Sequence, residues 1–176
     1  CLMKPCDYIS FHCFYCYNKR KGFFSKSVAI SFFPSLFYIP SQSNEMTKFN
    51  DMLKDGLEYT SEVVVVHANC ASAVGSGGLD VFATPSMVAL MENAAMNAVA
   101  PYLPEGSTTV GSEINTTHIK PSALGAEIKA TATLTAVEGR KLLFDVEARD
   151  ASGTIGKGTH VRFIVDIERF MAKLKQ

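Results

Sequence analysis

Hydrophobic positions along the chain predict one long helix followed by a series of half-buried strands. Residues 85–99 are apolar nearly all round a helical period, which is typical of a helix buried in a core. From residue 107 onward apolar and polar side chains alternate, as in strands with one buried face. A run of four valines at 63–66 suits a further strand before the helix. The predicted strands cover residues 57–68, 107–120, 126–137, 142–148 and 161–165, and residues 167–174 form a short amphipathic tail.

Turn residues separate these elements and set their order. Pro101 ends the helix, and Glu138 and Gly139 form a tight hairpin between two strands. One apolar helix followed by consecutive amphipathic strands predicts an α+β fold in which an antiparallel β-sheet wraps around one long central helix. Gly156 and Gly158 interrupt the last strand, which indicates either a bulge or the close approach of a ligand or another backbone.

Length and charge narrow the class of protein. The chain has 176 residues, enough for one sizeable core, and its formal net charge is zero. Nothing in residues 46–176, which carry a net charge of −3, resembles the basic face of a nucleic-acid-binding protein. No apolar run approaches the roughly 20 residues that a membrane-spanning helix needs. We therefore expect a cytoplasmic protein that binds neither nucleic acid nor membrane.

The first 45 residues differ from the rest of the chain. They begin at Cys1 rather than at methionine, hold seven of the twelve phenylalanines and show no sustained helical or strand period. We interpret residues 1–45 as a non-domain N-terminal extension, either translated upstream sequence or an artificial addition, with a targeting peptide as the alternative. The folded domain is expected to span residues 46–176, beginning at Met46.

Cysteines are concentrated in the same N-terminal segment. Four of the five lie in the first sixteen residues, and only Cys70 lies beyond them. The domain therefore has the composition of a reduced protein without a disulfide framework. Cys13 and Cys16 have zinc-like spacing, with His12 and Cys6 nearby, but no second pair of ligands follows. We predict no metal site.

Glu92 is the first candidate for chemistry. It lies in the middle of the apolar helix with no basic residue three or four positions away. A carboxylate in such surroundings pays a desolvation cost unless a specific group faces it. Burial would raise the pKa of Glu92 and make it a candidate general base or nucleophile.

Thr84 and His118 are the other candidates, and each also has a structural interpretation. Thr84 followed by Pro85 is a good helix start, with a capping hydroxyl and proline at the first helical position. His118 lies in the strand after the helix, on the face predicted to carry Val110 and Ile114, so it points toward the core or a cleft. A single histidine in that position is commonly a satisfied core or edge residue.

Three segments together resemble a known family. They are residues 83–92 (ATPSMVALME), 110–118 (VGSEINTTH) and 156–163 (GKGTHVRF). The chain resembles the hot-dog thioesterases over about residues 59–166, and within them the branch that includes fluoroacetyl-CoA thioesterase. The resemblance implies a hot-dog fold and acyl-CoA thioester hydrolysis by a catalytic set matching Thr84, Glu92 and His118. It also implies that Gly111 and Arg162 bind substrate.

The resemblance carries further expectations about substrate and partners. It implies a homodimer or a dimer of dimers, and no cofactor, since coenzyme A is part of the substrate. Residues 75–78 (GSGG) offer no bulky side chain to gate a very small acyl pocket. We therefore expect a short or medium acyl-CoA as substrate. Two alternatives stay open, a non-catalytic acyl-CoA binding or sensing module and a dehydratase of the same fold.

Spacing along the helix adds a prediction about assembly. Thr84 and Glu92 are eight residues apart, which places them about 12 Å apart along one helix axis. One helix cannot easily bring both groups to a single thioester carbonyl. We therefore predict a site assembled at the interface between two subunits.

Overall fold

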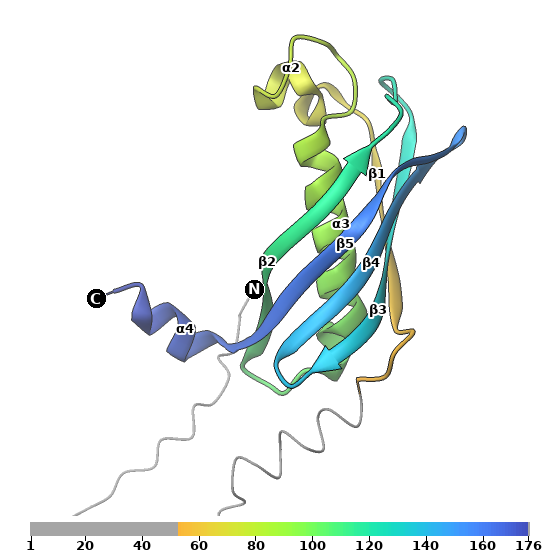
Figure 1. Ribbon diagram of the computed structural model, residues 1–176. Helices are drawn as coiled ribbons and strands as arrows, with labels where there is room; N and C mark the ends of the chain where they lie inside the picture. The colour runs from red at the N-terminus through yellow and green to blue at the C-terminus, as the bar shows by residue number, and fades with distance from the viewer. Residues whose placement is uncertain (1–52, 176) are drawn as a thin grey trace, which may run out of the picture. The chain divides into compact units, whose positions relative to one another are not determined.

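The structure of the protein is a computed structural model that describes residues 53–175 (Figure 1). The expectations for residues 1–45, including the zinc-like cysteine spacing, lie outside the described residues. The elements in chain order are β1 (Glu58–Val64), η1 (His67–Asn69), α2 (Ala71–Val74), α3 (Thr84–Val99), η2 (Ala100–Tyr102), β2 (Ser107–His118), β3 (Glu127–Glu138), β4 (Lys141–Asp150), β5 (Gly153–Asp166) and α4 (Ile167–Lys173).

Five antiparallel strands form one sheet in the order β1-β3-β4-β5-β2. Figure 1 shows this sheet curving around α3, with β2 and β1 at its two edges. The predicted α+β architecture, an antiparallel sheet around one long helix, is confirmed. Sequence alternation located β2, β3 and β4 to within a few residues, whereas β5 begins eight residues before the predicted range of 161–165. The loop before α3 holds two short helical turns that the pattern did not predict.

Helix α3 packs on the sheet with one face only. Its buried residues recur at helical spacing and meet the inward side chains of β3 and β4, so this packing forms the core. The prediction of a helix buried all round was wrong, because nothing in the described chain covers the opposite face, where Ala89 and Asn93 are exposed. The buried residues of α3 are Met87, Met91, Ala94, Ala95, Ala98 and Val99.

A β-bulge in β2 alters which side chains face the helix. The register between β2 and β5 shifts between Gly111 and Glu113. Val110 pairs with the exposed Phe163, whereas Ile114, beyond the bulge, pairs with the buried His160. The expectation that Val110 and His118 share one face was therefore wrong, because the extra residue reverses the alternation.

The two glycines of β5 permit close packing of backbone and side chains. A Cβ at Gly158 would collide with the backbone of Asn115 on the neighbouring strand. A Cβ at Gly156 would lie 2.6 Å from the sulfur of Met87 and 2.7 Å from the carbonyl oxygen of Thr117. Both alternatives left open by the sequence apply: other protein atoms approach closely at both positions, and the β4–β5 register shifts beside Gly156, between Ala148 and Arg149.

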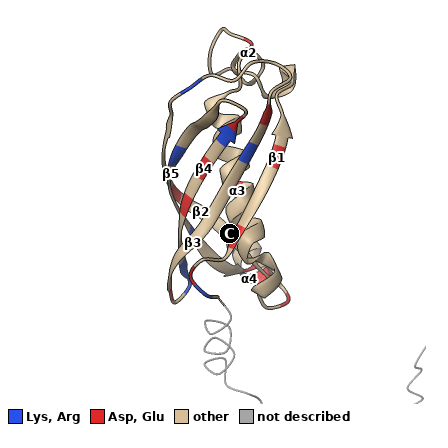
Figure 2. Ribbon diagram, turned by 90° about the vertical axis from the view of Figure 1, so that its right-hand side faces the viewer, with Lys and Arg blue, Asp and Glu red and all other residues tan. Residues whose placement is uncertain are grey.

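The remaining described surface carries charges of both signs. Figure 2 shows lysine, arginine and acidic segments interspersed over the strands. Among residues 53–175, no helix is long and apolar enough to cross a membrane, and no cluster of three or more metal-binding side chains occurs. Cys70 is buried and free.

Candidate active site

Thr84 and His118 form a hydrogen-bonded pair at one end of the helix. Thr84 is the first residue of α3, and His118 is the last residue of β2. The Thr84 hydroxyl lies 2.9 Å from Nδ1 of His118. The predicted capping role of Thr84 was wrong: Ala83 occupies the N-cap position, and no side chain caps this helix. The hydroxyl is therefore directed to the histidine rather than to the helix backbone.

The His118 ring is held in a largely apolar setting. It meets the ring of Phe82 edge-on, with centroids 6.5 Å apart and planes at 77°. Burial lowers the pKa of His118 below its ordinary value of 6.5, although the Lys120 backbone partly offsets this effect. Its Nε2 is buried and makes no hydrogen bond of normal geometry with the described residues. The ring is thus neutral near pH 7, with Nδ1 on the Thr84 hydroxyl and Nε2 without a hydrogen-bond partner among the described residues.

Glu92 lies two turns further along α3, against the bulge of β2. Its side chain is 41% exposed, so the predicted burial of this carboxylate was wrong for the single chain, because Glu92 emerges beside the uncovered face of α3. A Cβ at Gly111 would lie 2.5 Å from Oε1 of Glu92. Glycine at 111 therefore allows the carboxylate to approach the bare strand backbone.

Arg162 is buried beneath Glu92 rather than exposed on the surface. Its side chain projects from β5 toward the helix, and the residue is 6% exposed. Nε donates to Oγ1 of Thr109 and Nη2 to the Thr109 carbonyl, both at 2.8 Å. Nη1 approaches the backbone carbonyl of Glu92 at 3.5 Å. Three directed contacts fix the guanidinium plane at this point of the sheet.

His160 completes this cluster and was not predicted as a site residue. It projects inward two positions before Arg162, and its side chain is fully buried. Nε2 lies 3.1 Å from Nη1 of Arg162 and 3.7 Å from Oε1 of Glu92. A histidine and an arginine two apart occupy the inward face of β5, where apolar residues are the rule. This reversal of the usual pattern, with polar residues inward and apolar residues outward, was visible in the sequence, since the apolar Val161 and Phe163 fall on the other face.

The predicted site residues thus form two groups within one chain. Thr84 and His118 make the first group, and Glu92 lies with Gly111 and Arg162 in the second. About 12 Å of helix axis separates Thr84 from Glu92.

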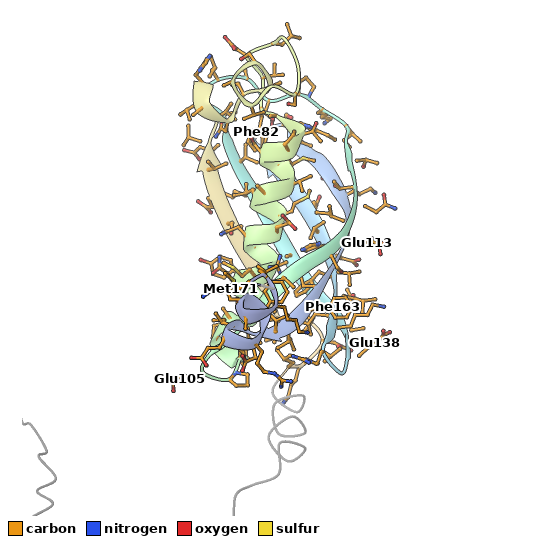
Figure 3. All side chains as sticks on the ribbon, turned by 90° about the vertical axis from the view of Figure 1, so that its left-hand side faces the viewer. Phe82, Glu105, Glu113, Glu138, Phe163 and Met171 are labelled. Carbon is orange, nitrogen blue, oxygen red and sulfur yellow. The ribbon has the colours of Figure 1, made fainter. Side chains whose placement is uncertain are left out.

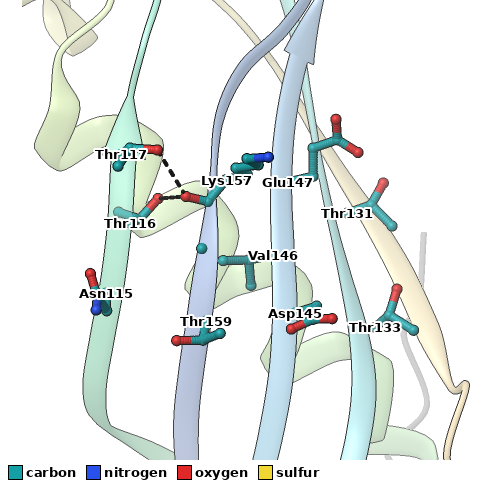
Figure 4. Close-up of a pocket in the computed structure, with 11 residues that line it drawn as sticks. Asn115, Thr116, Thr117, Thr131, Thr133, Asp145, Val146, Glu147, Lys157 and Thr159 are labelled. Carbon is teal, nitrogen blue, oxygen red and sulfur yellow. Dashed lines mark hydrogen bonds between the residues drawn. The ribbon is translucent and has the colours of Figure 1, made fainter.

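One cavity of the sheet lies apart from both groups. It has a volume of about 790 Å³ and opens on the sheet face that points away from α3 (Figure 4). Asp145, Glu147 and Lys157 are its charged residues, and none of the predicted site residues lines it. Two carboxylates against one lysine make it a poor receptor for the phosphates of coenzyme A.

The curled antiparallel sheet around one long helix, with polar groups gathered along the helix and the edge strand, defines a hot-dog protein. Residues 65–168 match the fluoroacetyl-CoA-specific thioesterase family, and the chain belongs to that family. A fluoroacetyl-CoA thioesterase of Streptantibioticus cattleyicolor is 44% identical over 97 residues, which are 55% of this chain and 70% of that protein.

Solved structures agree with this assignment. A crystal structure of a variant of the fluoroacetyl-CoA-specific thioesterase superposes with a TM-score of 0.67 and 36% identity, over 70% of this chain and 96% of that chain. A Thermus thermophilus protein described as a thioesterase superfamily member superposes with a TM-score of 0.65 and 27% identity, over 69% of this chain and 90% of that chain. The predicted hot-dog fold, family and enzyme class, a thioester hydrolase, are confirmed.

Proposed function

We propose that the protein hydrolyses the thioester of a short or medium acyl-CoA to the free acid and coenzyme A. The observation that carries this proposal is the Thr84–His118 pair, a neutral imidazole held through Nδ1 and unengaged at Nε2. The names of the relatives support the substrate class, and one solved relative is described as a complex with fluoroacetate and CoA.

The pair is suited to moving a proton. If the Thr84 hydroxyl donates to Nδ1, the ring proton resides on Nε2, which is buried and makes no hydrogen bond with the described residues. From there the ring gives this proton to the departing coenzyme A thiolate while Nδ1 takes up the Thr84 hydroxyl proton, so that the ring stays neutral and Thr84 regains a proton from water. Proton transfer by a positioned histidine typically contributes about 10²–10⁴-fold to a rate.

Glu92 acts on the thioester carbonyl. Its carboxylate either takes a proton from an attacking water or attacks directly, giving an anhydride that water then opens. In both routes water adds across the C–S bond, and the sulfur leaves with a proton. We assign to the Gly111 N–H the role of holding the carbonyl oxygen as charge develops, where loss of one donor costs about 2.7–4 kcal/mol.

We further propose that two subunits build each site. The 12 Å between Thr84 and Glu92 leaves the two groups too far apart to act on one carbonyl within a single chain. Strand β2, which carries Gly111 and His118, is an edge strand and has backbone groups free to pair with a second copy. Apolar side chains near it stay exposed in the single chain, among them Phe163 at 39% and Met171 at 49% (Figure 3).

The acyl range follows from the loop before α3. Residues 75–78 are exposed and carry nothing larger than a serine side chain. A loop of this kind does not close tightly over a two-carbon acyl group, which favours a substrate range wider than fluoroacetyl-CoA.

Free-thiol release from a panel of acyl-CoAs tests the proposal. We expect turnover by the parent protein, and a loss of at least about 100-fold in Glu92→Gln and His118→Ala. Glu105→Gln and His67→Ala are matched controls, since both side chains lie at the surface, that of His67 72% exposed. Saturable binding of acyl-CoA without thiol release would overturn the hydrolase and leave the binding or sensing module.

A further inference from the structure

His160 is the one fully buried histidine of the described chain, and both of its ring nitrogens face polar atoms. Nδ1 lies 2.7 Å from the backbone carbonyl of Glu113, immediately after the bulge of β2. Nε2 lies between Nη1 of Arg162 and Oε1 of Glu92. The ring also packs against Phe144, with centroids 6.4 Å apart. His160 therefore joins the bulge, the arginine and the carboxylate in one cluster.

The chemistry of these partners determines the ring's tautomer. A carbonyl only accepts hydrogen bonds, so Nδ1 carries a proton and donates a hydrogen bond to the Glu113 carbonyl. A guanidinium only donates, so Nη1 of Arg162 donates to a lone pair on Nε2. Burial, together with the charge of Arg162, lowers the pKa of His160, which agrees with a neutral ring near pH 7.

A proton on Nε2 would change the contacts of the ring with Arg162 and Glu92. This N–H would point at another donor, Nη1 of Arg162, 3.1 Å away. It would therefore turn to the carboxylate of Glu92, whose Oε1 lies 3.7 Å from Nε2. The carboxylate would then be paired with a cation and less able to act on a carbonyl. In the neutral ring, the lone pair on Nε2 holds Arg162 and offers no hydrogen bond to Glu92.

We propose that His160 is a positioning residue, whose Nδ1–H fixes the β2 bulge and whose Nε2 lone pair holds Arg162 against Glu92 while leaving that carboxylate unpaired. This inference rests on the proposed role of Glu92 in thioester hydrolysis. His160 itself does not contact the acyl group; it acts through Arg162 and through the strand backbone at Gly111, where an added Cβ would lie 3.1 Å from the His160 ring.

Two substitutions separate the functions of the two nitrogens. In His160→Asn the amide N–H falls near the position of Nδ1 and keeps the bond to Glu113, but the acceptor for Arg162 is lost. In His160→Gln the amide oxygen reaches the position of Nε2 and keeps that acceptor. We expect H160N to lower kcat about 10- to 100-fold, with KM changed by less than about threefold, and H160Q to recover most of that loss.

A purely structural role predicts a different outcome. Ile128→Val removes one methylene from a fully buried side chain on β3 and serves as the control for a comparable loss of stability. We expect it to lower the melting temperature without changing kcat. Equal loss of kcat in H160N and H160Q, in step with their melting temperatures, would overturn the inference.

A double-mutant cycle with Glu92→Gln, measured at high enzyme concentration, supplies the second test. If His160 acts through the Glu92 cluster, adding H160N to E92Q lowers the residual rate by less than about threefold. Loss of activity in E92Q with normal activity in H160N would overturn this inference alone. Full activity in E92Q would overturn the assignment of Glu92, and the role of His160 with it.

Discussion

At the scale of single residues, His118 sets how the activity depends on pH. Burial lowers its pKa below 6.5, so the ring that must accept a proton stays neutral to lower pH than an exposed histidine. We expect kcat/KM to hold constant from pH 8 down to about 6.5 and to fall only below that value. The measurement is kcat/KM for the best acyl-CoA between pH 4.5 and 8.5 at constant ionic strength. An acid limb with its midpoint above pH 7 would contradict the assignment.

Gly111 tests how closely the carboxylate approaches the strand. In Gly111→Ala the new methyl would lie 2.5 Å from Oε1 of Glu92 and 3.1 Å from Cε1 of His160. Glu92 is half-exposed, so it moves aside at little cost to the fold but at a cost to catalysis. We expect kcat to fall at least about tenfold while the melting temperature changes by only a few degrees. Unchanged kcat in a folded G111A protein would show that the carboxylate does not act from this position.

At the scale of elements, Gly158 allows β5 to pair with β2. A Cβ there would collide with the backbone of Asn115 and lie 2.6 Å from Cα of Thr116, and a strand backbone cannot turn aside as a side chain can. We expect Gly158→Ala to lower the free energy of unfolding by about 1–3 kcal/mol. Urea denaturation monitored by circular dichroism measures it. Gly78→Ala is the control, since a Cβ there meets no atom within 4 Å, and equal stability of the two variants would contradict the prediction.

The elements also show what sequence can and cannot predict here. Strand alternation and the apolar stretch before Pro101 predicted the helix and most strands closely, because burial on one face imposes a period. The part of β5 before residue 161 fell outside the predicted range. The β2 bulge escaped detection, since one extra residue reverses the alternation without changing composition. Thr84 was expected to cap the helix, as its residue type allows, but its hydroxyl bonds to a side chain 34 residues away.

The site shows the same division. Glu92, His118 and Arg162 were named as candidates because they stood out against apolar surroundings or matched a family. His160 was missed because its importance lies in its partners, the Glu113 carbonyl and the Arg162 guanidinium. Those contacts arise only once β2 and β5 pair in the bulged register.

At the scale of the whole molecule, the distance between the two polar groups predicts that each active site needs residues from two subunits. In a two-fold dimer with shared sites, Thr84 and His118 of one subunit act with Glu92 of the partner subunit. An E92Q chain and an H118A chain would each be inactive as homodimers. Their mixed dimer would hold one site with both substitutions and one site with neither.

Coexpression of the two variants with different affinity tags therefore tests where the site lies. With random pairing, half of the dimers are mixed and half of their sites are intact, so we expect about a quarter of the parent's activity. Dimers purified through both tags in succession should have about half of the parent's activity per dimer. If each site instead lay within one chain, both sites of every mixed dimer would carry a substitution, and activity would stay at the level of the single variants. Activity at that level in dimers that carry both tags would disprove the shared site, because Glu92 and His118 would then have to come from the same chain.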